Sequence, residues 1–178
     1  GYAETDRLGA PFDALKYAGN TVPHHGKTDD SGFSAEERKL TFESKKILEL
    51  PDLAISAQCC RVPVAVGHYM NAWITLGERA TVGDLAAVLG ESDQTPFVRL
   101  HRGASGESMS ALTSARDRDR AQVGRIRPDV RDDGGRSFCI TVVGDNLRLG
   151  AATNAVRIAT RWFPTADREL QSPAHAGG

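Results

Sequence analysis

The chain has 178 residues and a formal net charge of −1, with 22 lysines and arginines against 23 aspartates and glutamates. A single domain of this size hides roughly 70% of its unfolded surface, so one well-buried core is expected. The balanced charge favours small-molecule or protein partners over nucleic acids or anionic membranes, which select basic surfaces. No apolar run approaches the roughly 20 residues that span a bilayer, and GYAETDRLGA lacks the pattern of a secretion signal. We therefore expect a soluble, cytoplasmic protein.

The first helical pattern follows a mixed lead-in segment, residues 1–19. Ser34 followed by Glu37 matches an N-cap with a capping box. Apolar side chains then recur at Leu40, Phe42, Ile47 and Leu48. This spacing predicts a helix from about Ala35 to Leu48, which Pro51 is expected to stop because proline cannot continue a helix.

The next segments predict strand, strand and helix. LAISAQCCRVPVAVGH, residues 53–68, has the β-branched content and length of one or two strands, although Pro63 argues against an unbroken central strand. NAWITLGE, residues 71–78, alternates as another strand would. TVGDLAAVLGE, residues 81–91, predicts a short helix with Thr81 or Asp84 near its start.

The second half begins with a polar excursion at about 92–122, which we expect to be a loosely ordered loop whose charge run is a solvated face. VGRIRPDV and RSFCITVVGDNLRL predict two strands joined by the turn-rich RDDGG. GAATNAVRIATRWF, residues 150–163, predicts an amphipathic helix before a frayed tail, 164–178. The whole order predicts an α+β domain over 20–163, with a mixed or antiparallel sheet and helices packed on one face.

The cysteines and histidines do not predict a metal site. Cys59, Cys60 and Cys139 form an odd and sparse set, which argues against a disulfide framework. Cys59 and Cys60 point to opposite faces of a strand and lack zinc-ligand spacing, so both are expected to pack in the core. The pair His24 and His25 in TVPHHGK is expected in a surface loop.

Four charged residues could carry chemistry. Arg61 lies in an expected strand, where a buried guanidinium would need a carboxylate or phosphate. His68, expected at that strand's end, has a side chain suited to general acid or base chemistry, but the residues alone leave a structural role equally open. An unbroken strand would point the two side chains to opposite faces, whereas a bend at Pro63 or Gly67 could bring them into one pocket. Glu43 and Lys46 share a helix face, which by spacing alone favours a surface ion pair.

Motifs for nucleotide binding and for a serine nucleophile are missing from the sequence. There is no GxGxxG loop opening a βαβ unit, no P-loop and no GxSxG elbow. The residues themselves therefore do not encode a nucleotide-binding half.

Four segments occur together in an order typical of one family. They are FESKKIL at 42–48, ISAQCCRVPVAVGH at 55–68, VGRIRPD at 123–129 and VVGDNLRLGAATNAVRIA at 142–159. They resemble the C-terminal substrate-binding and dimerisation domain of the aspartate-β-semialdehyde dehydrogenase family, and NTVPHHGK at 20–27 is similar to the segment that leads into that domain. The resemblance implies the α+β fold of the C-terminal domain of glyceraldehyde-3-phosphate dehydrogenase-like enzymes.

The resemblance also implies a reaction and residue roles. The family reduces β-aspartyl phosphate to aspartate semialdehyde with NADPH, at a branch point toward lysine, threonine and methionine. Arg61 would hold the substrate α-carboxylate, Glu43 its amino group and Lys46 the phosphate. His68 would act as the acid/base that assists thiohemiacetal formation and breakdown.

In the family, the nucleophilic cysteine and most of the NADP site lie in an N-terminal nucleotide-binding half. This chain alone is therefore not expected to bind NADP, although Asn146, Gly150 and Asn154 would lie on the cofactor side. A homodimer is implied. Three departures, Tyr69, Gln58 and Cys60, bear on substrate identity. A non-catalytic dimerisation or ligand-binding paralogue and a related acyl-phosphate reductase, such as the N-acetylglutamyl-phosphate type, remain as alternatives.

Overall fold

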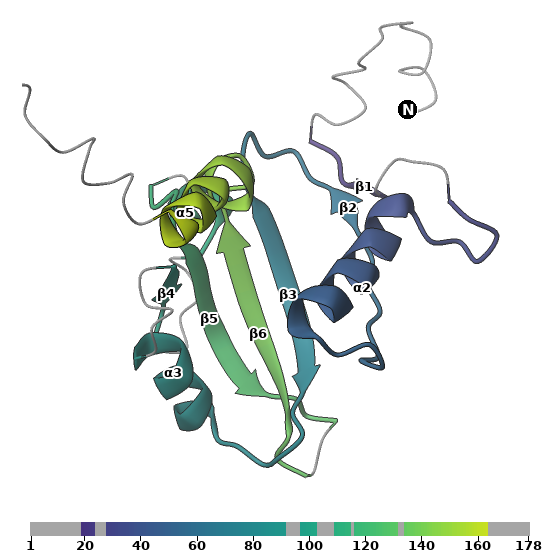
Figure 1. Ribbon diagram of the computed structural model, residues 1–178. Coiled ribbons are helices and arrows are strands. Elements are labelled where there is room, and N and C mark those ends of the chain that lie inside the picture. Colours follow the sequence, from purple (N-terminus) through teal and green to yellow (C-terminus); the bar gives the residue numbers. More distant parts are fainter. Residues whose placement is uncertain are drawn as a thin grey trace, which may run out of the picture. The chain divides into compact units, whose positions relative to one another are not determined.

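The structure is a computed structural model that describes residues 19–23, 28–91, 97–102, 109–114, 116–131 and 134–163 (Figure 1). The chain divides into two compact units, residues 1–64 and 65–178. Apart from Gly19, the expected lead-in segment and the expected tail lie outside the described residues, as do His24 and His25.

The first unit contains the predicted helix with the predicted bounds, α2 (Ala35–Leu48). Its capping box is formed because Glu37 N–H donates to Ser34 Oγ at 3.3 Å and Ser34 N–H donates to Glu37 Oε2 at 2.8 Å. Glu49 ends the helix in a left-handed conformation, φ 56°, with its N–H directed at the carbonyls of the last turn. The stop therefore precedes Pro51 by two residues and comes from the backbone cap.

The expected strands over 53–68 are much shorter than predicted. In the first unit, β2 (Cys60–Arg61) pairs with β1 (Val22–Pro23) in an antiparallel ladder. The pairing ends at Arg61, and two residues later Pro63, which has no N–H to donate, lies in a tight turn closed by Val64 N–H donating to Val62 O at 2.8 Å. A strand-like composition is therefore interrupted by local turn geometry.

The second unit contains a four-stranded sheet of order β3-β6-β5-β4. Its strands are β3 (His68–Thr75), β4 (Val98–Leu100), β5 (Ala121–Pro128) and β6 (Ser137–Gly144). Only β4 and β5 run parallel, so the prediction of an α+β fold with a mixed sheet is confirmed. The predicted hairpin of β5 and β6 is also confirmed, and β3 begins three residues before the strand expected at Asn71.

Two helical segments pack on the same face of this sheet (Figure 1). A Cβ on Gly90 of α3 (Val82–Glu91) would lie 3.2 Å from Leu100, and a Cβ on Gly144 would lie 3.2 Å from Leu149 of the π-helix η3 (Arg148–Ala152). The strand registers put Leu100 and Gly144 on one face. The predicted packing of helices on one face therefore holds for α3 and for η3, which leads directly into α5 (Thr153–Trp162).

The described residues of the expected loose excursion at 92–122 include regular secondary structure. The segment contains β4 and the short helix α4 (Ala111–Ser114), and β5 begins within it at Ala121. Met109 is buried, and a Cβ on Gly124 would lie 2.5 Å from its Sδ. The prediction of a loosely ordered loop is therefore wrong for the described parts of this segment, which pack against the sheet.

Candidate functional site

The first unit ties the helix of Glu43 and Lys46 to the strand of Arg61 through one buried carboxylate. Glu37, besides closing the capping box, accepts a hydrogen bond from the backbone N–H of Cys59 on Oε1 at 2.7 Å. Its two oxygens therefore fix the start of α2 and the chain that enters β2. The spacing of Ser34 and Glu37 predicted the cap. The contact between Glu37 and Cys59, which are 22 positions apart, has no local sequence signal.

Glu43 and Lys46 lie on the part of α2 that faces away from this anchor. At roughly 100° per residue, Lys46 lies about 180° and Glu43 about 120° around the helix from Glu37. Both side chains are exposed. Neither makes an ion pair with another described residue, so the surface ion pair that spacing alone favoured does not form. Their charges remain available to a ligand.

Arg61 lies on β2 opposite Val22 and is exposed. A buried guanidinium would have needed an anionic partner, but β2 is a two-residue strand in a two-stranded sheet and leaves the Arg61 side chain exposed. Cys60 is also exposed, which overturns its expected core position, whereas Cys139 is buried and Cys59 is half-buried. Burial, followed by the charge of Glu37, raises the pKa of the Cys59 thiol and keeps it protonated, so Cys59 is a poor nucleophile.

In the second unit, His68 opens β3, whereas the sequence predicted it at the end of a strand. Gly67 before it has φ 117°, a conformation that glycine adopts without strain. The Gly67 N–H donates to Asn146 Oδ1 at 2.8 Å. His68 pairs with Gly144 in the antiparallel ladder, so its side chain shares the sheet face that carries η3 and α5.

Asp145 organises the turn that carries Asn146, and sequence reasoning missed it. Its side chain is fully buried and accepts the Leu147 and Arg148 N–H groups on Oδ1, both at 2.8 Å. Arg118 Nε donates to Oδ2 at 2.6 Å and, with these backbone donors, holds the pKa of Asp145 below its ordinary value. The only sequence signal was an acidic residue directly after an apolar, strand-like run.

The three residues expected on the cofactor side fit that role unequally. Asn154 is exposed in the first turn of α5, and Gly150 is exposed with only the Asp145 carbonyl oxygen, at 3.8 Å, near a Cβ placed on it. Asn146 has its Oδ1 bound to Gly67, which leaves its amide nitrogen for a ligand. Gly150 and Asn154 thus leave a surface that a nicotinamide cofactor could approach, while Asn146 is partly committed to the fold.

The predicted site residues are divided between the two units. The first holds Glu43, Lys46 and Arg61, and the second holds His68 together with Asn146, Gly150 and Asn154. Within the second unit, the structure brings Asn146 to the residue before His68. A pocket shared by Arg61 and His68 stays a prediction.

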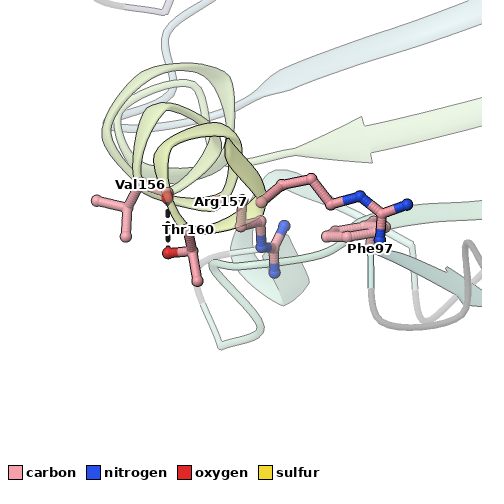
Figure 2. Close-up of a pocket in the computed structure, with 5 residues that line it drawn as sticks. Phe97, Val156, Arg157 and Thr160 are labelled. Carbon is pink, nitrogen blue, oxygen red and sulfur yellow. Dashed lines mark hydrogen bonds between the residues drawn. The ribbon is translucent and has the colours of Figure 1, made fainter. Parts of the chain in front are cut away.

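The second unit also has an open groove of about 530 Å³ between α5 and the start of β4 (Figure 2). The Cζ atom of Arg157 lies over the Phe97 ring, 4.7 Å from its centre. Val156, Thr160 and Arg161 complete the lining of the groove. The groove contains none of the residues expected to carry the chemistry. It therefore adds no member to the candidate site.

Within the described ranges, no three His, Cys, Asp or Glu side chains gather as metal ligands would. None of the helices there is long and apolar enough to cross a membrane.

Known proteins similar to this chain are aspartate-semialdehyde dehydrogenases. The chain is 38% identical to the Corynebacterium glutamicum enzyme over 149 residues, which covers 83% of this chain and 39% of the relative, and 38% identical to the Bacillus subtilis enzyme over 141 residues, which covers 79% and 39%. The chain thus spans about two fifths of the length of these curated relatives.

Solved structures similar to this chain are also aspartate semialdehyde dehydrogenases. Aspartate semialdehyde dehydrogenase II from Vibrio cholerae superposes with a TM-score of 0.78 at 28% identity, over 92% of this chain and 47% of that chain. The same enzyme complexed with ASA gives a TM-score of 0.74 at 30% identity, over 89% and 47%. The family of the semialdehyde dehydrogenase dimerisation domain matches residues 4–149. The chain therefore belongs to the semialdehyde dehydrogenase dimerisation-domain family, as the motifs around Arg61 and His68 predicted.

Proposed function

We propose that this chain forms the substrate-binding and dimerising part of an aspartate-semialdehyde dehydrogenase. The enzyme would catalyse the NADPH-dependent reductive dephosphorylation of β-aspartyl phosphate to aspartate semialdehyde. The main support is the 38% identity to curated aspartate-semialdehyde dehydrogenases over 149 residues, a stretch long enough to span the predicted substrate residues. A cytoplasmic location and a role in amino-acid biosynthesis belong to the same proposal.

The exposed charges of the first unit suit the substrate. Arg61 carries a planar fork of donors, which can bind the α-carboxylate through two parallel hydrogen bonds. Lys46 supplies a compact positive charge for the phosphate, and Glu43 supplies an acceptor for the amino group. All three side chains are exposed, so a substrate can reach them without first breaking a described ion pair.

His68 would act as the general acid/base of the reaction. As the cysteine of the nucleotide-binding half adds to the substrate and leaves it, the imidazole takes up and returns the proton. NADPH, when bound, supplies the hydride that reduces the acyl group after phosphate departs. Gly150 and Asn154 would lie against that cofactor, which the nucleotide-binding half holds, so the chain alone would not bind NADP.

A second copy of the chain is the proposed protein partner, because the matching family is a dimerisation domain. Sedimentation equilibrium of the chain tests this point. We expect a concentration-independent mass of twice 19.1 kDa in the micromolar range. A monomer at those concentrations would contradict it.

The function is tested in the complete enzyme, in which this chain is joined to a nucleotide-binding half. The assay follows phosphate-dependent reduction of NADP by aspartate semialdehyde. We expect turnover that His68→Gln lowers by at least about 100-fold, the usual scale for loss of a general acid/base. His101→Gln is the matched control, because the His101 ring is hydrogen-bonded to Gln122, which lies on the sheet face opposite His68. Absence of turnover would favour a non-catalytic paralogue, and a preference for another acyl phosphate would favour the related reductase.

A further inference from the structure

We infer that Asn146 is a positioning residue for His68, an inference that rests on the proposed function of His68. A role on the cofactor side would use only the side-chain amide nitrogen of Asn146 and would leave the role of its amide oxygen unexplained. The amide oxygen of Asn146 is engaged by the Gly67 N–H at 2.8 Å, over 79 positions of sequence. The residue before the proposed acid/base is thus held by the turn that follows β6.

This contact fixes the backbone of His68 from one side while the ladder fixes it from the other. The register of β3 and β6 pairs His68 with Gly144, two residues before Asn146. Gly67 at φ 117° is the conformationally permissive point before the strand. A hydrogen bond at that point limits the rotation that would swing the imidazole, since backbone direction sets where a strand side chain points.

Asn146 can act in this way because its own backbone is fixed. The adjacent Asp145 carboxylate accepts the Leu147 and Arg148 N–H groups, and its carbonyl accepts the Gly150 N–H at 3.0 Å. These bonds lock the turn on both sides of Asn146. A charged side chain that is fully buried needs such partners, and it gives the turn one well-defined geometry.

The charge run of the predicted excursion supplies the outer support. Arg118 Nε reaches Asp145 Oδ2 at 2.6 Å. Asp119 accepts from Arg148 Nη2 at 2.8 Å and from Thr153 Oγ1 at 2.8 Å, where η3 passes into α5. The charge run keeps the partly exposed side chains expected of a solvated face, and in addition Arg118 and Asp119 brace the turn that holds Asn146.

Amide exchange measured by NMR on the 178-residue chain tests the contact directly. In the unsubstituted chain, the Gly67 amide should be protected from solvent exchange. Asn146→Ala should speed its exchange by about tenfold, the scale expected for one lost hydrogen bond, and shift the His68 imidazole resonances. Asn146→Asp, which keeps an acceptor oxygen, should restore both. An unprotected Gly67 amide, or equal protection in Asn146→Ala, would overturn the inference.

Asn71→Ala is the matched control. Like Asn146, Asn71 accepts a hydrogen bond on its amide oxygen, here from Thr141 Oγ1 of the neighbouring strand at 2.8 Å. Asn71 lies on the opposite face of β3 from His68. This variant should leave the Gly67 amide and the His68 resonances unchanged. Equal shifts in both variants would show general loosening of the sheet and would overturn a specific role for Asn146.

Kinetics of the complete enzyme separate the two proposals. Asn146→Ala should lower kcat by about tenfold or more with KM within about twofold, because a misplaced acid/base impairs the chemical step, and Asn146→Asp should recover most of kcat. If His68→Gln keeps full turnover, the proposed function of His68 fails, whatever the exchange data show. If His68→Gln is inactive but Asn146→Ala is fully active, the positioning role alone fails.

Discussion

Glu37 Oε1 accepts the backbone N–H of Cys59 at 2.7 Å, which joins helix α2 to the chain two residues before Arg61. The other carboxylate oxygen closes the capping box on Ser34. One side chain, 8% exposed, therefore sets where the helix starts and where the short strand β2 enters the unit. The relative placement of Glu43, Lys46 and Arg61 depends on this carboxylate.

Glu37→Ala should strongly destabilise the first unit. The substitution leaves the Ser34 and Cys59 N–H groups without their acceptors, at a cost of about 2–4 kcal/mol in the free energy of unfolding. Glu37→Gln keeps only one acceptor oxygen and should lose about half as much. Glu36→Ala, one position away and outside these bonds, is the control. Equal urea midpoints for all three variants would contradict this account.

Arg61→Lys should raise KM and lower kcat in the complete enzyme. A lysine preserves the charge but not the planar fork, so kcat/KM should fall by roughly 10–100-fold. Arg127→Lys, an exposed arginine of β5, should change neither constant. Unchanged kinetics for Arg61→Lys would remove Arg61 from the substrate site.

Stability should fall in acid because two buried carboxylates have lowered pKa values. Arg131, through hydrogen bonds, lowers the pKa of Asp129 from 3.8 to about 2, and Arg118 lowers that of Asp145. A folded-state pKa below the unfolded value contributes stability that is fully present above the unfolded pKa and is lost as pH falls through the folded value. The urea midpoint should therefore drop between about pH 4 and pH 2.

The control for this pH dependence is a comparison of two aspartates. Asp129→Asn should flatten the slope of the midpoint against pH in that window, because it removes one of the groups responsible. Asp52→Asn, an exposed aspartate outside any ion pair with the described residues, should leave the slope as it is. A slope that Asp129→Asn does not change would show that the acid loss arises elsewhere.

Gly124→Ala should destabilise the second unit. The added Cβ would lie 2.5 Å from Met109 Sδ and 3.1 Å from both the Cβ and the carbonyl oxygen of His101. Overpacking of this kind costs about 1–3 kcal/mol in thermal or urea unfolding. In a double-mutant cycle, Gly124→Ala should cost less in a chain that already carries Met109→Ala than in the unsubstituted chain, because the closest atom is gone. Gly77→Ala, with open space around its Cβ, is the control, and an equal effect of both glycine changes would contradict the crowding.

Local signals predicted the elements whose ends are set locally. The bounds of α2 followed from Ser34, Glu37 and the apolar spacing, because a capping box involves residues only three positions apart. The hairpin of β5 and β6 followed from two strand-like segments on either side of the turn-rich RDDGG. The strands around Arg61 were overestimated because β-branched composition does not reveal whether a partner strand exists.

Sequence alone could not predict contacts that only the folded chain creates. β4 has three residues, too few to show a period, and it pairs with β5 from within a polar segment. The role of Asp145 depends on Arg118, 27 positions away, and that of Asn146 on Gly67, 79 positions away. Family motifs pointed to Arg61 and His68, whereas the residues that support His68 were visible only in the structure.

A crystal structure of the complete enzyme with aspartate semialdehyde bound tests the central claim most directly. We expect the Arg61 guanidinium to hold the α-carboxylate through two hydrogen bonds, with the His68 ring within hydrogen-bonding distance of the aldehyde oxygen. A ligand bound elsewhere, or an Arg61 guanidinium that does not reach the carboxylate, would contradict the proposed function.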